Sequence, residues 1–184
     1  MASSPELVVL VDHTGAPIGT RLKSDVHDEN TPLHLASSCY LFDEHGRVLV
    51  TRRALTKKTW PGVWTNSFCG HPGPDESFNE AIMRRADQEL GVEIVAIRGE
   101  IPTFSYRAVD ASGIVENEIC PVFTAHTTGV LAPVPEEVCD WQWVTPGTLV
   151  EAVTAAPYAF SPWMREQLPQ LHQLGALLGG HRNV

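Results

Sequence analysis

The stretch GHPGPDESFNEAIMRRADQELGV, residues 70–92, is the part of the sequence that most strongly indicates the fold, because it predicts a helix with defined ends. Ser77 and Glu80 have the spacing of a capping box, in which the two residues satisfy each other's backbone N–H groups at a helix start. The apolar residues that follow recur near helical spacing, at Phe78, Ile82, Ala86 and Leu90. Gly91 is a typical residue just past a helix end. The pattern predicts one helix of about 13 residues.

Segments on both sides of this helix alternate between apolar and polar residues, which indicates strands. We expect strands at residues 7–12, 35–43, 47–53, 92–101, 104–109, 114–127 and 135–145, the second and third forming a hairpin. Two further helices are expected at 145–153 and 161–178, each opened by Thr or Ser followed by Pro. Pro169 should bend or interrupt the second of these. The outline is an α+β fold with a mixed sheet, one central helix and additional C-terminal helices.

Length and composition favour one soluble globular domain over residues 1–184, since 184 residues with 43% hydrophobic and 19% charged side chains are ordinary for such a unit. The net charge of -9 argues against nucleic acid or an anionic membrane as partner. No apolar run approaches the roughly 20 residues of a membrane span, and no signal peptide is apparent, so a cytoplasmic protein is expected. Five basic residues within 47–58 nevertheless suit a small anionic ligand.

The four cysteines are widely spaced and show no CxxC pair, which favours free thiols. Cys39, Cys120 and Cys139 lie in strand-like apolar contexts and are interpreted as core thiols. Cys69 lies two residues before His71, among turn formers and aromatics. From its position alone it could be a metal ligand, a buried thiol or a catalytic acid and base.

Glu116 and Glu118 are two apart on an expected strand and therefore share a face. A solvated face is the simplest explanation, but apolar neighbours favour a covered strand, where paired carboxylates need a metal ion or a shared proton. His27, His34 and His71 lie in or beside loops, and each alone is more commonly a surface or hydrogen-bonded histidine. Together with the glutamates they would form a nitrogen and oxygen ligand set suited to zinc, manganese or iron.

Residues 70–92 resemble the Nudix box, the loop, helix and loop with which a large family binds divalent metal ions and a diphosphate. The matching positions are Gly70, Glu76, Arg84, Glu89 and Gly91. Arg85 and Gln88 stand where the box has acidic residues. In Nudix hydrolases those carboxylates hold the magnesium ions that activate water, so their loss argues against hydrolysis.

The chain as a whole resembles the type I isopentenyl-diphosphate isomerases, a Nudix-fold family with an altered box. The resemblance covers about residues 5–168 and is carried by the runs LVTRRALTKKTWPGVWTNSFCGHP, SGIVENEICPVF and AFSPWM. It implies an α/β/α sandwich-like fold and the interconversion of isopentenyl and dimethylallyl diphosphate in isoprenoid biosynthesis. Residues 169–184 have no specific match and are expected to form a helical or frayed tail. A monomer is favoured.

The resemblance implies that Cys69 and Glu118 are the two proton-transfer groups, on opposite faces of the bound isoprenoid, and that Tyr106 supports Glu118. It also implies a site for one Zn2+ or Mn2+ ion. The residues of that implied site are His27, His34, His71, Glu116 and Glu118. Since this ligand set is complete without sulfur, Cys69 is assigned as acid and base.

Further positions are implied to hold the diphosphate. Glu89 and the backbone carbonyl of Cys69 match a Mg2+ site. Four cationic residues match contacts to the diphosphate itself: Lys23, Arg53, Lys57 and Arg85. Trp163 matches an aromatic that lies over the developing cation, although packing at a helix start would also explain a tryptophan there.

The chemistry of the implied reaction agrees with these residue types. Protonating an unactivated alkene gives a tertiary carbocation, which requires an acid, a base on the other side, and walls that exclude water. A tryptophan face attracts positive charge without offering a nucleophile. Arg85 stands in place of a box carboxylate. A group that would hold a metal ion and activate water is thereby replaced by a cation that can contact the diphosphate directly.

Three other functions remain open at the level of sequence. Gly70, Glu76, Arg84 and Glu89 would suit a Nudix diphosphohydrolase, against which Arg85 and Gln88 argue. An enzyme or cyclase that protonates an alkene of a longer prenyl diphosphate would use the same acid and base. A non-catalytic metal-binding module would need neither an acid and base nor a diphosphate site.

Overall fold

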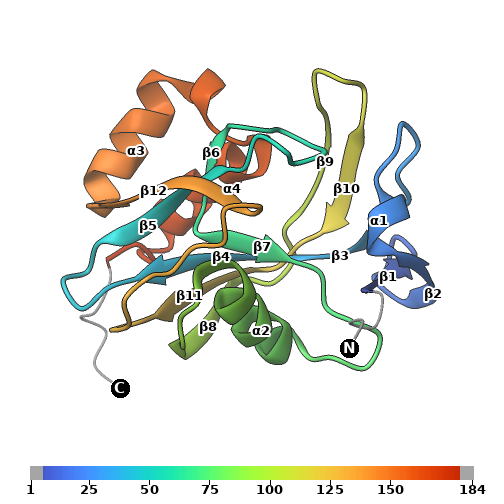
Figure 1. Ribbon diagram of the computed structural model, residues 1–184, viewed down its shortest axis with the longest axis horizontal. Helices are drawn as coiled ribbons and strands as arrows, with labels where there is room; N and C mark the ends of the chain where they lie inside the picture. Colours follow the sequence, from blue (N-terminus) through green and yellow to red (C-terminus); the bar gives the residue numbers. More distant parts are fainter. Residues whose placement is uncertain (1–5, 179–184) are drawn as a thin grey trace.

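The computed structural model describes residues 6–178, which form two mixed β-sheets covered by helices (Figure 1). The first sheet has the order β2-β1-β3-β10-β9: Pro17–Leu22, Leu7–Val11, His34–Leu35, Val115–Ile119 and Ser105–Val109. The second has the order β12-β5-β4-β11-β8: Val138–Val144, Val48–Arg53, Ser37–Phe42, Val122–His126 and Val95–Ile101. Two short strands, β6 (Trp64–Thr65) and β7 (Phe68–Gly70), pair with β5 and β4.

The central helix forms as the sequence predicts. It is α2, Phe78–Leu90, and both hydrogen bonds of the capping box between Ser77 and Glu80 are present. Gly91 ends the helix with φ 64°, a left-handed conformation that favours glycine. The other helices are α1 (Lys23–Val26), α3 (Pro146–Ala155), the 3-10 turn Pro157–Ala159 and α4 (Pro162–Gln173).

The second sheet lies between two helical layers, which confirms the expected sandwich. All six residues of β4 are buried, as expected for a strand covered on both faces. Tyr40 and Phe42 belong to the apolar cluster that includes α3 and α4, whereas Cys39 and Leu41 belong to the cluster that includes α2. Figure 1 shows α2 on one side of this sheet and α3 and α4 on the other.

The single strand expected at residues 114–127 is two strands in different sheets. β10 ends at Ile119 and β11 begins at Val122, so the chain crosses between the sheets at Cys120 and Pro121. Pro121 has no backbone N–H to donate to a ladder, which explains the break. The chain makes the same crossing between β3 and β4, at Ala36. The one expected sheet is therefore two sheets joined by parallel crossings.

The expectation that Cys139 is a core thiol was wrong. Cys139 is exposed, whereas Cys39 and Cys120 are buried. β12 is an edge strand, and its pairing with β5 shifts register between Val138 and Asp140, which places the intervening cysteine outside the core. All four thiols are free, as expected.

The last helix also differs from expectation. α4 continues through Pro169 without interruption and ends at Gln173, before the expected limit of 178. Pro169 lies at the eighth position of the helix, where its side chain borders a shallow surface hollow with Arg165 and Glu166. The helical or frayed tail was expected over residues 169–184. Its last part, residues 179–184, lies outside the described residues.

Replacing the helix cap should weaken the fold measurably. Ser77→Ala removes the side-chain acceptor for the backbone N–H of Glu80, and we expect the free energy of unfolding to fall by about 1 kcal/mol in urea titration. Asn79→Ala, at an exposed position of the same helix turn, is the control and should change stability by less than about 0.5 kcal/mol. Equal effects of the two substitutions would contradict the role of the cap.

Candidate active site

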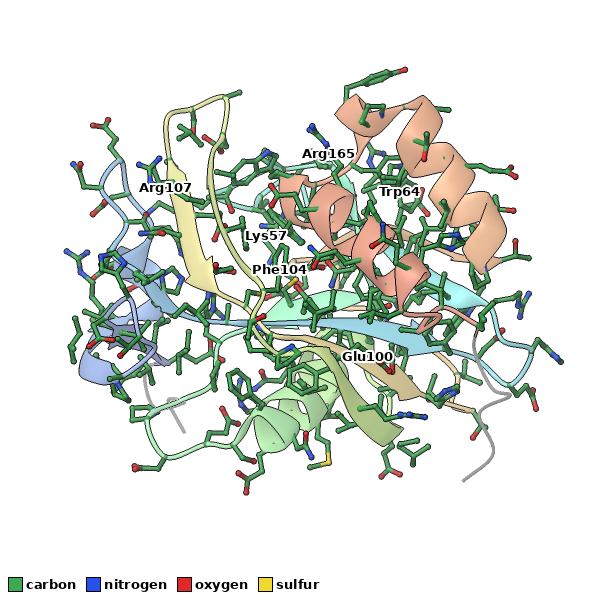
Figure 2. The ribbon with its side chains drawn as sticks, turned by 180° about the vertical axis from the view of Figure 1, so that it is seen from behind. Lys57, Trp64, Glu100, Phe104, Arg107 and Arg165 are labelled. Atoms are coloured by element: carbon green, nitrogen blue, oxygen red, sulfur yellow. The ribbon has the colours of Figure 1, made fainter. Side chains whose placement is uncertain are left out.

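A cavity of about 590 Å³ opens where the two sheets meet. Every candidate site residue from the sequence lines it except His34, which is fully buried beside Glu118. Figure 2 shows Lys57 between the β9–β10 hairpin and α4, the elements that supply Tyr106, Glu116, Glu118 and Trp163 to the same cavity. The structure thus brings together residues that lie up to 140 positions apart in the sequence (Lys23 to Trp163).

Three histidines converge on one oxygen of Glu118. The Nε2 atoms of His71, His34 and His27 lie 3.2, 3.4 and 4.0 Å from Oε1 of Glu118. His34 reaches it because β3 and β10 pair in parallel with His34 opposite Glu118. The other oxygen, Oε2, accepts a hydrogen bond of 3.0 Å from the hydroxyl of Tyr106, which lies opposite Glu118 on β9. One oxygen of the Glu118 carboxylate therefore faces the histidines, and the other faces the Tyr106 hydroxyl.

The histidine cluster fits a divalent metal ion. In the part of the chain that the structure describes, ligand atoms of His27, His34, His71 and Glu118 lie within 4.8 Å of one another. Buried ring nitrogens of all three histidines lack a hydrogen-bond partner of good geometry: Nε2 of His27, Nε2 of His34 and Nδ1 of His71. Leaving such atoms without a partner is costly, and an ion beside Oε1 of Glu118 would satisfy Nε2 of His27 and Nε2 of His34.

The protonation of Glu118 and His71 suits a metal site, whereas a proton on His34 would compete with a metal ion. Burial would raise the pKa of Glu118, but the nearby rings of His34 and His71 hold that pKa well below its usual range, so the carboxylate is ionised. Burial lowers the pKa of His71 to about 4, which keeps a neutral nitrogen available as ligand. Burial opposes the charged form of His34, yet Glu118 outweighs it and the pKa of His34 is raised.

Glu116 lies beside the cluster but outside the group of atoms that are mutually close. Its Oε2 is 3.0 Å from Nε2 of His27, and its Oε1 accepts a hydrogen bond of 2.6 Å from the hydroxyl of Thr59. Glu116 and Glu118 share a face of β10, as expected, and both are buried. A role of Glu116 as a ligand stays a prediction.

The apolar wall of the cavity carries a thiol and two aromatic rings. Cys69 lies on β7, and burial raises the pKa of its thiol to about 11, so the sulfur is protonated at neutral pH. Trp163, at the start of α4, is only 2% exposed, and its ring centroid is 5.7 Å from that of Tyr106. The indole nitrogen donates a hydrogen bond of 2.9 Å to Oδ1 of Asn66, which leaves the ring face free of hydrogen bonds.

Cationic side chains line the part of the cavity away from the apolar wall, and nearby carboxylates form ion pairs with them. Lys23 is 2.5 Å from Glu6, and Lys57 contacts Glu137. Arg85 is only 5% exposed and donates from Nε to Glu89 at 2.9 Å.

Arg53 joins this cationic region to the apolar wall. Its guanidinium donates to the carbonyl of Thr59 at 2.9 Å, and the centre of the guanidinium lies 5.4 Å from the ring of Trp163. A dianionic group could replace the carboxylates as partner of these cations.

The two departures from the Nudix box fit together in space. A Cβ atom on Gly70 would lie 2.4 Å from Cγ of Arg85, so glycine is needed where Arg85 enters the cavity. Gln88 accepts hydrogen bonds from Arg84 at 3.1 Å and from Arg85 at 3.3 Å. The box thus has an arginine, Arg85, and an amide, Gln88, at positions where carboxylates would hold metal ions.

Several residues of the site were missed by the sequence analysis. Glu137, Thr59 and Lys58 line the cavity, and Asn66 contacts both Trp163 and Cys69. Glu137 belongs to no motif, so its proximity to the site had no sequence signal, whereas Thr59 lies within the run LVTRRALTKKTWPGVWTNSFCGHP. Asn66 lies within the same run, three residues before Cys69, and this proximity was its signal.

Comparison with known proteins gives a consistent result. A NUDIX domain is matched over residues 32–171. The chain is 57% identical over 175 residues to an isopentenyl-diphosphate Delta-isomerase of Paenarthrobacter aurescens, covering 95% of each chain. It is 60% identical over 183 residues to the enzyme of that name from Agromyces mediolanus, covering 100% of this chain and 87% of the relative.

Solved structures show the same fold at low identity. A Deinococcus radiodurans protein has a TM-score of 0.69 and 21% identity, with 90% of this chain and 98% of that chain covered. A MutT protein from Methanosarcina mazei has a TM-score of 0.62 and 18% identity, with 78% and 96% covered. Within residues 6–178, none of the helices is both long and apolar enough to cross a membrane.

Removing one histidine should release a bound metal ion. We expect one transition-metal ion per chain and a loss of affinity of at least about tenfold in His34→Ala, since even residues that only support a ligand change affinity by this much. Competition with a chromophoric chelator measures the affinity, and circular dichroism checks the fold. His45→Ala, which removes an exposed histidine, is the control. Unchanged affinity in His34→Ala would contradict the site.

Proposed function

This chain belongs to the isopentenyl-diphosphate Delta-isomerases of the NUDIX family, and we propose that it interconverts isopentenyl diphosphate and dimethylallyl diphosphate in isoprenoid biosynthesis. One observation of the structure carries the assignment of the site. The thiol of Cys69 and the Glu118–Tyr106 pair line one cavity, whose other part holds a group of cationic side chains. Such a cavity suits a short hydrocarbon joined to a diphosphate.

The two proton-transfer groups would act in sequence. In the forward direction Glu118 must first take up a proton. With the support of the Tyr106 hydroxyl it then delivers that proton to the terminal alkene carbon, whose π electrons form the new C–H bond and leave a tertiary cation. Loss of a proton from the neighbouring methylene to Cys69 returns an electron pair and forms the new double bond. Only the thiolate can accept this proton, so Cys69 must first release its own proton to solvent. Burial raises the pKa of the thiol, which makes the thiolate, once formed, a strong base.

The walls of the cavity would protect the cation between these steps. Trp163 and Tyr106 present aromatic rings rather than a nucleophilic lone pair, and the quadrupole of the indole favours positive charge. Trp163 is held in place by its hydrogen bond to Asn66. The aromatic wall supports the proposal because an exposed nucleophile at this place would be alkylated.

The cationic region would bind the diphosphate. We propose contacts from Lys23, Arg53, Lys57 and Arg85. A Mg2+ ion, which prefers oxygen ligands, would be held with the diphosphate by Glu89 and the backbone carbonyl of Cys69. The Zn2+ or Mn2+ ion of the histidine site, when bound, would lower the charge around Glu118 and fix its orientation. The ligands proposed there are His27, His34, His71, Glu116 and Glu118.

The altered box argues against hydrolysis of the same diphosphate. Arg85 and Gln88 provide no carboxylate to bind a second ion, and Arg85 instead approaches with a guanidinium. A hydrolase would need an activated water molecule near phosphorus. The substrate would therefore be bound without being cleaved.

The remaining parts of the proposal concern the state of the protein. We propose that residues 1–184 work as a single domain, because both sheets contribute to one cavity. A monomer with a small-molecule prenyl diphosphate as its partner needs no residue from a second chain. The free thiols support a reducing compartment such as the cytoplasm.

Removing the thiol of Cys69 should abolish turnover. We expect the wild-type protein in heavy water to convert isopentenyl diphosphate into deuterated dimethylallyl diphosphate, followed by proton NMR. Cys69→Ala should reduce kcat by at least about 100-fold, because it removes a proton-transfer group. Cys139→Ala, which removes an exposed thiol, should leave kcat unchanged. Full activity in Cys69→Ala, or release of inorganic phosphate by the wild type, would contradict the assignment.

Neutralising one cation should weaken substrate binding. Lys57→Gln removes a charge that now pairs with Glu137 at the edge of the cavity. We expect kcat/KM to fall by about 10- to 100-fold, since a charge-assisted contact to the diphosphate contributes on this scale. Arg47→Gln, in a turn and paired with Asp43, is the control. A diphosphate contact is excluded if steady-state kinetics of the two variants are alike.

A further inference from the structure

The position of the Cys69 sulfur is set by side chains that have no part in the reaction as described above. Cys69 on β7 lies directly opposite Ser38 on β4, and the two side chains therefore share a face of the sheet. The Sγ atom of Cys69 is 3.3 Å from Oγ of Ser38 and 3.4 Å from the amide group of Asn66. Two contacts on one sulfur select one of the three staggered χ1 positions.

Ser38 is itself held by a buried chain of hydrogen bonds. Nε2 of Gln167 donates to Oγ of Ser38 at 2.9 Å, and the hydroxyl of Tyr40 donates to Oε1 of Gln167 at 3.1 Å. The Ser38 hydroxyl also lies 3.3 Å from Sγ of Cys120, so its one donor and two acceptor positions all have partners. Ser38, Gln167 and Tyr40 are each 0% exposed. Each polar side-chain atom of this chain has a hydrogen-bond partner and is buried from solvent.

Asn66 is held in the same way from the other side. Its Nδ2 donates to the carbonyls of Phe68 at 2.8 Å and Cys39 at 3.1 Å, while its Oδ1 accepts from the indole of Trp163 at 2.9 Å. Trp163 and Gln167 are four residues apart on α4 and so lie on one face of that helix. One helix therefore fixes both contacts of the sulfur.

We propose that Ser38 and Gln167 are positioning residues of the active site: through them, α4 holds the Cys69 sulfur at the place from which it exchanges a proton with the bound isoprenoid. The inference rests on the proposed isomerase function and adds residues to it. Proton transfer to or from carbon requires close alignment of the reacting atoms, and a displacement of about 1 Å can cost on the order of 100-fold in rate. A buried thiol with no fixed partner would lose that alignment.

The test compares two neighbouring serines. Ser38→Ala removes the hydroxyl beside Cys69, and Ser37→Ala removes an equally buried hydroxyl that donates to the carbonyl of Gly70 instead. We expect Ser38→Ala to lower kcat by about 10- to 100-fold, with KM roughly unchanged because the cations that bind the diphosphate are untouched. Ser37→Ala should keep the kcat of the wild type. Thermal unfolding confirms that both variants are folded.

A second variant and a second measurement separate positioning from folding and from function. Gln167→Met keeps the length of the side chain, removes the donor to Ser38, and should give the same loss of kcat at constant KM. In crystal structures of the variants, which need no turnover, Sγ of Cys69 should leave its position near Asn66 in Ser38→Ala but not in Ser37→Ala.

The outcomes distinguish the two proposals. An unmoved sulfur in Ser38→Ala and Gln167→Met, or equal kcat in the two serine variants, would overturn the positioning role while wild-type turnover upheld the isomerase. A wild-type protein without isomerase activity would overturn the proposed function, and the sulfur positions would still decide whether Ser38 and Gln167 hold Cys69 in place.

Discussion

The parallel pairing of β3 with β10 is the constraint on which the site depends. It sets His34 opposite Glu118 at the point where the chain passes from the first sheet to the second. A shift of one residue in this register would turn Glu118 away from the histidines, because neighbouring side chains on a strand face opposite sides. The antiparallel pairing with β9 then places Tyr106 on the same carboxylate. The histidine cluster and the proposed acid thus depend on the registers of β10 with its two neighbouring strands.

Charge is distributed so that a strongly anionic chain can contain a cationic pocket. Overall the net charge is -9, yet lysines and arginines line one cavity, where Glu6, Glu89 and Glu137 balance them. Arg85 has the largest effect, because it occupies a box position that otherwise bears a carboxylate. Its buried side chain requires Gly70 as its neighbour, since a Cβ there would overlap the arginine. In the proposed function, binding of a diphosphate and avoidance of hydrolysis would follow from the same exchange of charge.

The C-terminal helix α4 both packs in the apolar core and holds the residues that contact Cys69. α4 packs on the second sheet through Met164, Leu168 and Leu171, and the same helix supplies Trp163 and Gln167 to the neighbourhood of Cys69. The apolar contacts fix the position of α4. Hydrogen bonds from Trp163 and Gln167 on this helix then fix Asn66 and Ser38, the two residues that contact the thiol of Cys69. Stability of the core and the proposed alignment of the Cys69 sulfur therefore depend on the same helix.

The sequence by itself determined the central helix, the caps at Ser77 and Gly91, and the residue types of the site, because these depend on local spacing and on a recognisable pattern. It also placed Glu116 and Glu118 on one face. Only the tertiary structure decided that residues 114–127 divide between two sheets, that Cys139 is exposed at an edge, and that Ser38 and Gln167 meet beside Cys69. These features arise from strand pairing and helix packing between distant segments, which local periodicity does not encode.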